Sequence, residues 1–321
     1  MREAIIIGGG LAGLSAAIYL GRARRDVLVI DAGHSMAVWE PDVQNYLGFP
    51  EGISGEALLE RGREQAIRFD AKFVEDRIVE TSGRCGEFVL KGDHDEYRAR
   101  RLIIATGLTH LPPEIPGVKE CLGHSMFFCK DCDGYRVQGK TLVIMGATDD
   151  AVEYALSMLM YSPKVYLVTN GEEPRWDECH AKWMEEYEIP YHTGRVVSIN
   201  HEKRQIKGLC FEGGRELAAD YLFTVRGDAY HNGLAISLGA AVDADGQVEV
   251  DHCMQTSVKG LYAAGCVTPA NCQMVIAAGQ GARAAQAINR DLFEEDIATH
   301  ALRRFRQVQV RTEATLPEVV E

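Results

Sequence analysis

The sequence predicts an α/β fold of two Rossmann-like, three-layer domains, the second inserted into the first. Two observations lead to this prediction. A buried strand, a glycine turn, an Ala-rich helix and another strand follow one another twice along the chain, and a proline-rich stretch separates the two copies. We expect residues 1–113 and 246–321 to form the first, discontinuous domain, and residues 114–245 to form the inserted one.

The first strand–helix–strand unit lies at the start of the chain. Apolar Ala4–Ile7 is the expected strand, residues 11–22 the helix, and Val27–Ile30 the second strand, which ends at Asp31. The stretch from Ala4 to Gly21 carries no charge, but its glycines divide it into two elements. We therefore expect no membrane span.

The later strands and helices are predicted from the same kinds of sequence pattern. A buried strand is expected at 102–105, a proline-rich linker at 111–117, and the second unit as strand 142–145, turn 146–150, helix 151–160 and strand 165–168. Residues 260–265 resemble a strand that ends in a glycine turn, and the Ala-rich residues 274–290 predict a helix. We expect one further helix to about residue 306, then a solvated or dimer-packing tail.

Composition narrows the class of protein. The 321 residues are 46% hydrophobic and 25% charged, which excludes a disordered chain. The net charge of -13 argues against nucleic acid or an anionic membrane as partner. The nine cysteines are an odd number spread over a long chain, unlike a secreted disulfide framework. We expect a reducing, cytoplasmic location.

The glycine turn of the first unit has the pattern Gly8-x-Gly10-x-x-Gly13. The first glycine permits a tight turn, the second lets a pyrophosphate approach the backbone, and the third lets helix and strand pack closely. Free N–H groups at the helix start would hold the pyrophosphate. Asp31, at the end of the next strand, stands where a ribose hydroxyl is bound, so the sequence predicts a dinucleotide site.

A second motif is the pair Cys129 and Cys132, followed by Asp133. Two cysteines at this spacing can close a small, redox-active disulfide ring, and the carboxyl beside them can move a proton during exchange. Cys121 and His124 precede the pair and leave a metal site as an alternative, although the spacing is cramped for zinc. Inert buried thiols are a further alternative.

These motifs give the chain a specific likeness. From Met1 to about Arg290 it resembles the low-molecular-weight thioredoxin reductase family of flavoproteins. The resemblance rests on five segments in the family's order, namely 8–13, 45–55, 103–107, 129–134 and 262–265. It implies two dinucleotide-binding domains of the FAD/NAD(P) type, FAD bound by the discontinuous domain, a homodimer and a thioredoxin-like or other small disulfide partner.

The resemblance also implies roles for single residues. It assigns FAD contacts to Gly8, Gly10, Gly13, Asp31, Asn45, Gly107, Gly265, Cys266, Gln273 and Met274. The last two begin the helix beneath the flavin ring, where the helix dipole favours negative charge on the reduced flavin. Cys132 would face the flavin, Cys129 would attack the partner's disulfide, and Asp133 would act as the acid. The assignment includes no metal.

The second glycine turn departs from the family. Thr148 stands where glycine is expected, and Asp150 adds a carboxylate beside the usual Asp149. The family's cationic cluster for the NADPH 2′-phosphate is replaced by Glu172 and Glu173, which leaves only Arg175. Gly146, Thr148, Asp149 and Asn170 therefore form a candidate second nucleotide site for which NADPH is doubtful.

A third departure is Cys266, which stands where the family has an aspartate. It could pair with Cys272 as a second exchange couple, but we expect both to be unpaired, buried thiols.

Some relatives of this family also lack the nicotinamide-binding motifs, namely the ferredoxin-dependent flavin thioredoxin reductases and the diflavin-linked disulfide oxidoreductases. This chain resembles them because it lacks the same motifs. The sequence thus predicts an FAD-dependent disulfide oxidoreductase that uses ferredoxin or a second FAD rather than NADPH. A conventional NAD(P)H-dependent thioredoxin reductase is the alternative. A non-catalytic flavin redox sensor is the alternative from another class.

Overall fold

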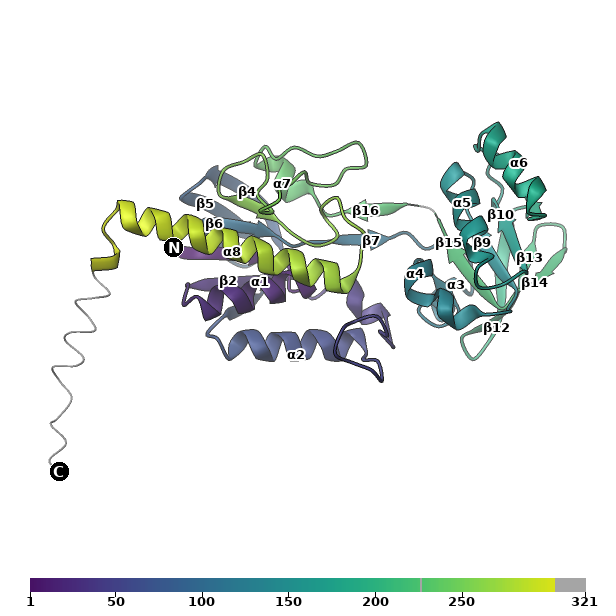
Figure 1. Ribbon diagram of the computed structural model, residues 1–321, viewed down its shortest axis with the longest axis horizontal. Coiled ribbons are helices and arrows are strands. Elements are labelled where there is room, and N and C mark those ends of the chain that lie inside the picture. Colours follow the sequence, from purple (N-terminus) through teal and green to yellow (C-terminus); the bar gives the residue numbers. More distant parts are fainter. Residues whose placement is uncertain (226, 304–321) are drawn as a thin grey trace, which may run out of the picture. The chain divides into compact units, whose positions relative to one another are not determined.

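The computed structural model describes residues 1–225 and 227–303 and divides into two compact units. The first unit comprises Met1–Ser35, Leu59–Gly107 and the chain from Tyr230 onward (Figure 1). The second comprises Met36–Leu58 and Leu108–Ala229. This division differs from the expected boundaries at residues 36–58 and 108–113, which belong to the second unit, and at residues 230–245, which belong to the first.

The first unit is built on a seven-stranded sheet in the order β3-β2-β1-β6-β5-β4, with β17 also paired to β6. Its parallel strands are β1 (Arg2–Ile7), β2 (Val27–Asp31), β3 (Lys72–Glu75), β6 (Glu96–Ile104) and β17 (Leu261–Ala263). An antiparallel hairpin, β4 (Ile78–Arg84) and β5 (Glu87–Gly92), extends the sheet. Because β1, β2, β6 and β17 are parallel, their carboxyl ends meet at one edge, where ligands bind in such folds.

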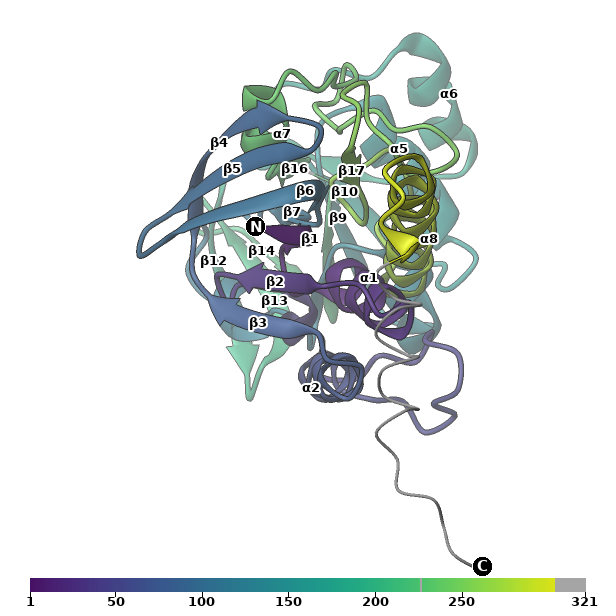
Figure 2. The same ribbon diagram turned by 90° about the vertical axis from the view of Figure 1, so that its left-hand side faces the viewer.

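One face of this sheet is covered by α1 (Leu11–Arg22) and α8 (Met274–Ala298), which lie side by side (Figure 2). Small residues allow the close approach, since a methyl group on Gly281 of α8 would overlap the backbone of Ala12 in α1. The unit also contains α7 (Gly233–Ser237) and most of α2 (Gly55–Ile67). The close contact of the two long helices brings their N-terminal ends to the same sheet edge.

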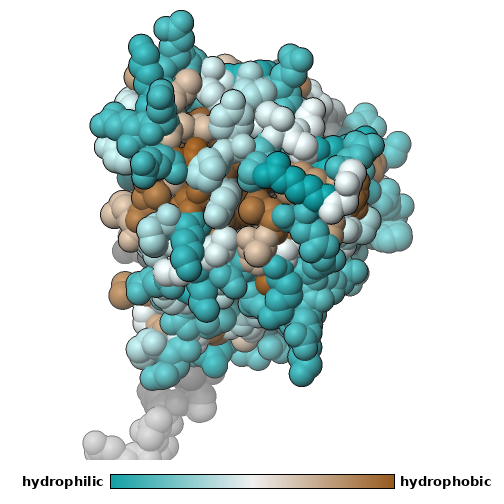
Figure 3. Space-filling model, turned by 90° about the vertical axis from the view of Figure 1, so that its right-hand side faces the viewer, coloured by the Kyte–Doolittle hydropathy of each residue, from teal (hydrophilic) through white to brown (hydrophobic). Residues whose placement is uncertain are grey.

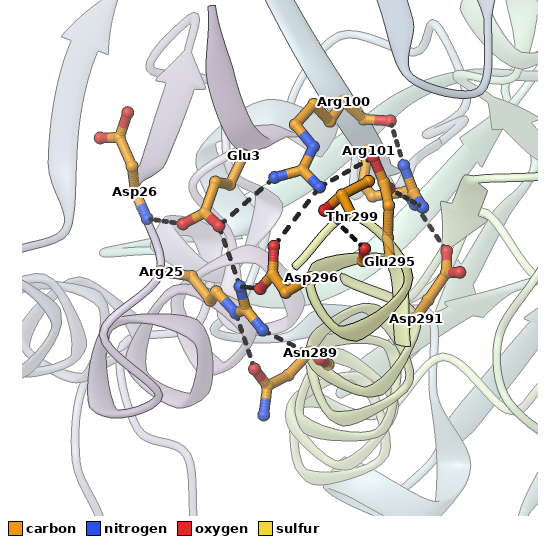
Figure 4. A network of polar contacts seen from close by, with 10 residues as sticks. All are labelled: Glu3, Arg25, Asp26, Arg100, Arg101, Asn289, Asp291, Glu295, Asp296 and Thr299. Atoms are coloured by element: carbon orange, nitrogen blue, oxygen red, sulfur yellow. Dashed lines mark hydrogen bonds and ion pairs between the residues drawn. The ribbon is translucent and has the colours of Figure 1, made fainter. Parts of the chain in front are cut away.

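A polar network fixes the C-terminal end of α8 against the strands (Figure 4). Arg101 of β6 is only 3% exposed and contacts Asp291 at 2.5 Å and Glu295 at 2.8 Å. Arg25 contacts Asp296 at 2.6 Å, and two or more partners satisfy each buried guanidinium. These pairs explain why α8 continues well beyond the predicted end at residue 290.

The second unit has a parallel sheet in the order β11-β10-β9-β15-β8 and a three-stranded antiparallel sheet. The parallel strands are β8 (Met126–Phe127), β9 (Leu142–Met145), β10 (Val165–Val168), β11 (Tyr191–His192) and β15 (Tyr221–Thr224). The antiparallel strands are β12 (Val196–Glu202), β13 (Gln205–Phe211) and β14 (Glu216–Ala218). A separate strand pair joins β7 (Leu108–His110) to β16 (Asp228–Tyr230).

The helices of the second unit are α3 (Val118–Cys121), α4 (Lys130–Asp133), α5 (Asp149–Met158) and α6 (Glu178–Glu186), with two 3-10 turns at Met36–Trp39 and Gly134–Val137. α5 follows β9 through the second glycine turn, and α4 carries the cysteine pair. No helix among the described residues is long and apolar enough to cross a membrane. On the face drawn in Figure 3, hydrophobic side chains are interrupted by hydrophilic ones.

The predicted α/β fold is confirmed. The helix at 11–22 and the strands at 142–145 and 165–168 have the predicted bounds. The helix expected at 151–160 spans Asp149–Met158, and the two aspartates lie in its first turn. The further helix expected after residue 290 is the continuation of α8 to Ala298, and the expected tail lies beyond residue 303, outside the described residues.

Candidate active site

The sulfur atoms of Cys129 and Cys132 are bonded to each other, with their Cα atoms 5.3 Å apart. Cys129 is the residue that precedes α4, and its Sγ accepts a hydrogen bond from the Cys132 backbone N–H at 3.2 Å. Both residues are partly exposed. The pair is therefore accessible, and a backbone donor is in place to stabilise negative charge on the Cys129 sulfur.

Asp133 follows the pair and is 3% exposed. Burial raises the pKa of its carboxyl to about 7, assisted by the nearby charges of Glu40 and Asp42 and opposed by Arg136. Arg136 Nε lies 3.4 Å from Asp133 Oδ1, and its terminal nitrogen contacts Asp42 Oδ2 at 3.3 Å. Burial likewise raises the pKa of Glu40. A carboxyl with a pKa near neutrality can hold a proton and release it.

The sequence did not identify Glu40, Asp42 or Arg136 as part of this site. Arg136 stands three residues after Asp133, so this short spacing could have indicated that the two side chains are in contact. Glu40 and Asp42 come from a distant segment, Met36–Leu58, which reaches the dithiol only through the fold of the second unit. No local pattern in the sequence points to that contact.

Aromatic side chains pack against the residues on either side of the dithiol. Phe128 stacks on His110, with ring centroids 4.5 Å apart, and His110 Nδ1 lies 2.5 Å from Asp228 Oδ1. The ring of Tyr161 packs directly against Gly134, so a side chain at position 134 would displace it. The backbone around the pair is thus held by packing on both sides.

The residues of the alternative metal site, Cys121, His124, Cys129 and Cys132, have other partners or surroundings in the structure. Cys129 and Cys132 are bonded to each other, Cys121 is fully buried, and His124 Nε2 faces Arg204 at 2.7 Å. Among the described residues, the groups whose ligand atoms converge lie elsewhere, at Asp251–Cys253 and at Asp149, Asp177 and His180.

The glycine turn of the first unit suits a pyrophosphate. A methyl group on Gly8 would overlap the Ala105 carbonyl, and one on Gly13 would overlap the Gly8 carbonyl. At Gly10, by contrast, the nearest atom to an added Cβ is Ser35 Oγ at 3.7 Å, so this side of the turn is open. α1 has no acidic residue in its first turn and no side-chain cap from the described residues. The free N–H groups can therefore bind an anion.

Several other predicted cofactor residues adjoin this turn. A Cβ on Gly9 would lie 2.5 Å from Asp31 Oδ2, so the carboxylate borders the turn. Gly265 has a φ of +85° and would contact Ala12 if it carried a Cβ. Gly107, with a φ of +67°, accepts a backbone hydrogen bond from His231. Asn45 is different, because it lies in the second unit.

The start of α8 completes this edge of the sheet. Gln273 precedes the helix and Met274 is its first residue, and the first turn again has no acidic residue. Cys266 and Cys272 are bonded to each other, with Cα atoms 5.0 Å apart. The expectation of unpaired, buried thiols was therefore wrong: the short loop returns Cys272 to Cys266, and both remain partly exposed.

The second candidate nucleotide site has a different character. A Cβ on Gly146 would lie 2.7 Å from that of Ala151, so the turn is tight. The residue before α5 is Thr148, and Asp149 Oδ1 accepts a hydrogen bond from the Asp177 backbone at 2.8 Å. Asn170 accepts one from the Val196 backbone at 2.8 Å. Gly146, Thr148 and Asp149 lie in one turn and Asn170 follows the neighbouring strand β10, but Asp149 and Asn170 already have intramolecular partners.

Rossmann-type units that carry a Cys-x-x-Cys disulfide define a nucleotide-dependent disulfide oxidoreductase. Comparison with known proteins agrees: the profile of the pyridine nucleotide-disulphide oxidoreductases matches residues 2–315. The chain belongs to this family and is a thioredoxin reductase-like enzyme. Thioredoxin reductase of Bacillus subtilis is 31% identical over 305 residues, which cover 89% of this chain and 93% of the relative.

Solved structures also match this chain over nearly its whole length. HlmI superimposes with a TM-score of 0.87 at 30% identity, covering 96% of this chain and 97% of that protein. Thioredoxin reductase of Giardia duodenalis gives a TM-score of 0.81 at 28% identity, covering 91% and 98%. The relatives favour a conventional thioredoxin reductase over the NADPH-independent enzyme predicted from the sequence, for which the comparisons give no support. FAD as cofactor is consistent with the family.

Proposed function

We propose that this enzyme reduces the disulfide of a thioredoxin-like protein. The observation that carries the proposal is the accessible Cys129–Cys132 pair next to a buried carboxyl whose pKa is near 7. The name of the Bacillus subtilis relative supports the same partner. By analogy with the family we further propose that the chain acts as a homodimer.

The cysteines perform the exchange in two steps. In the reduced pair, the Cys129 thiolate attacks one sulfur of the partner disulfide and forms a mixed disulfide, and the partner's other sulfur leaves as a thiolate. Asp133 donates the proton that this leaving group takes up. Cys132 then attacks Cys129, which releases the partner as a dithiol and restores the Cys129–Cys132 bond.

The residues of the first unit fit the cofactor of this reaction. Gly8, Gly10 and Gly13 would hold the pyrophosphate of FAD and Asp31 its ribose, while the start of α8 would face negative charge on the ring. When bound, FAD supplies the electron pair that reopens the Cys129–Cys132 disulfide.

For the electron donor we infer a pyridine nucleotide, on the strength of the relatives. A second candidate, ferredoxin or a second FAD, is favoured by a specific observation. The N-terminus of α5 bears Asp149 and Asp150, and the only nearby cation of the next loop, Arg175, pairs with Glu172 at 3.2 Å. Glu172 thus occupies the cation that would pair with the 2′-phosphate of NADPH, a group that neither ferredoxin nor FAD carries.

Three experiments test the proposal. Steady-state reduction of thioredoxin should require the dithiol, so C129S/C132S should lose turnover while it keeps its flavin spectrum. Full activity of this variant would refute the exchange mechanism, and failure of the wild type with every donor would favour a redox sensor.

Anaerobic mixing with NADPH or NADH then separates the donors, because rapid bleaching of the flavin band supports the conventional enzyme. No bleaching, together with bleaching by reduced ferredoxin, supports the second candidate. A flavin-to-chain ratio of two supports the diflavin form.

A further inference from the structure

The loop between β17 and α8 holds a disulfide that the proposed reaction does not use. Cys266 follows Gly265 at the carboxyl end of β17, and Cys272 stands immediately before Gln273 at the start of α8. The loop therefore begins and ends at the sheet edge where the glycine turn of α1 lies. A Cβ added to Gly265 would lie 3.0 Å from Ala12 Cβ, so the loop starts close to α1.

The turn beside Cys266 is held by hydrogen bonds that do not depend on the disulfide. The backbone N–H of Gly265 donates to Gln280 Oε1 at 2.8 Å, and Thr268 Oγ1 donates to the Gly265 carbonyl at 2.9 Å. The backbone of Val248 donates to Val267 at 2.8 Å. These contacts come from α8, from within the loop and from a neighbouring segment, so breaking the sulfur–sulfur bond leaves the turn supported.

A mainly structural role for this bond is also weak on general grounds. A disulfide stabilises a fold largely by restricting the unfolded chain, and this effect is smallest for short loops. The pair closes a loop with a sequence separation of six residues. Both cysteines are partly exposed, as are Cys129 and Cys132, so solvent can supply protons to either sulfur.

The site also favours the reduced form electrostatically. α8 runs for 25 residues from Met274, and its first turn has no acidic residue. A thiolate released at Cys272 would stand next to the positive end of this helix.

We propose that Cys266–Cys272 is a second redox-active disulfide of this enzyme, reduced by FAD whose pyrophosphate the neighbouring glycine turn would hold and whose ring would face the start of α8, next to Cys272. In the step, the sulfur–sulfur bond breaks, reduced FAD is oxidised by two electrons, and two protons from solvent and flavin complete the two thiols. The fully reduced chain would then store three electron pairs: one on FAD and one on each cysteine pair. The inference rests on the FAD binding of the proposed function.

The test uses holoprotein of C129S/C132S, which keeps only the second pair, in an anaerobic titration with dithionite. We expect uptake of two electron pairs per flavin, and mass spectrometry after maleimide labelling should find new thiols at Cys266 and Cys272. The same variant stripped of FAD is the control and should gain far fewer thiols. C266S/C272S should take up two pairs per flavin, and the quadruple variant only one.

Three results would overturn the inference: uptake of a single pair by C129S/C132S, equal opening of the pair without FAD, or labelling of both cysteines before any reduction. If C266S/C272S fails to fold, the titration of C129S/C132S still decides, because that variant keeps the pair. A wild type that binds no FAD would refute the proposed function. A normal flavin spectrum with Cys266–Cys272 unopened would refute this inference alone.

Discussion

The Nε atom of Arg136 lies 3.4 Å from Oδ1 of Asp133, yet this guanidinium does not keep the carboxyl ionised. Burial and the charges of Glu40 and Asp42 outweigh it, and the pKa of Asp133 rises to about 7. Arg136 also contacts the carboxylate of Asp42 at 3.3 Å, so its charge is shared. Asp133 is therefore a carboxyl that stays protonated at a pH where most carboxyls are ionised.

The first prediction concerns proton donation by Asp133. Below about pH 7 its carboxyl is protonated and can donate, so the rate of disulfide reduction should fall as pH rises through 7. Asp133→Asn should lower the rate on the order of 100-fold and remove this pH dependence. Stopped-flow oxidation of the reduced enzyme by thioredoxin disulfide measures both. An unchanged pH profile in the variant would exclude Asp133 as the acid.

The same shift predicts how stability depends on pH. The folded pKa of Asp133 exceeds the unfolded value of 3.8, so the native state binds this proton more tightly. Its contribution to the free energy of unfolding is fully present below about pH 4 and is lost as pH rises through 7. Asp133→Asn should be less destabilised by this pH increase than the wild type. Urea denaturation at pH 5 and pH 8 compares the two proteins, and equal losses of stability would contradict the prediction.

Two glycines of α8 provide a matched pair. Gly281→Ala should push α8 away from Ala12 of α1, destabilise the protein by about 1–3 kcal/mol and reduce flavin content. At Gly279, an added Cβ meets no described atom within 4 Å, so Gly279→Ala should gain about 1 kcal/mol from helix propensity. Thermal unfolding and flavin absorbance test both variants. Similar effects at the two positions would argue against the close helix contact.

The buried end of the polar network predicts a large loss of stability. Arg101→Ala removes a buried guanidinium from Asp291 and Glu295, of which Glu295 keeps Arg100 at 2.9 Å, and should cost about 2 kcal/mol. Arg98 of the same strand is exposed and pairs with Glu96 at 3.0 Å, so Arg98→Ala should cost less than about 1 kcal/mol. Chemical denaturation distinguishes the two, and a small effect at Arg101 would show that the partners are compensated by solvent.

Thr224 offers a stabilising substitution. Its Oγ1 is buried and has no hydrogen-bond partner among residues 1–225 and 227–303. Thr224→Val keeps the shape, removes the unsatisfied hydroxyl and should raise stability by about 1 kcal/mol. A lower melting temperature than the wild type would mean that this hydroxyl has a partner in solution.

Local patterns predicted much of the fold. The apolar runs at 142–145 and 165–168 became strands with those bounds, because parallel strands buried on both faces need continuous hydrophobic sequence. The β4–β5 hairpin was not predicted, since its buried residues alternate with exposed ones and form no continuous apolar run. The length of α8 was underestimated because ion pairs with Arg25 and Arg101, not propensity, fix its last turns.

By itself, the sequence identified the glycine turn at Gly8–Gly13 and the Cys-x-x-Cys motif at Cys129 and Cys132, because both motifs depend on spacing within a few residues. The tertiary structure decided what surrounds them. It placed Glu40 beside Asp133 and joined Cys266 to Cys272 at the edge of the cofactor turn. The physical reason is that a carboxyl's pKa and the pairing of two thiols depend on burial and on distances through space, which residue spacing alone does not specify.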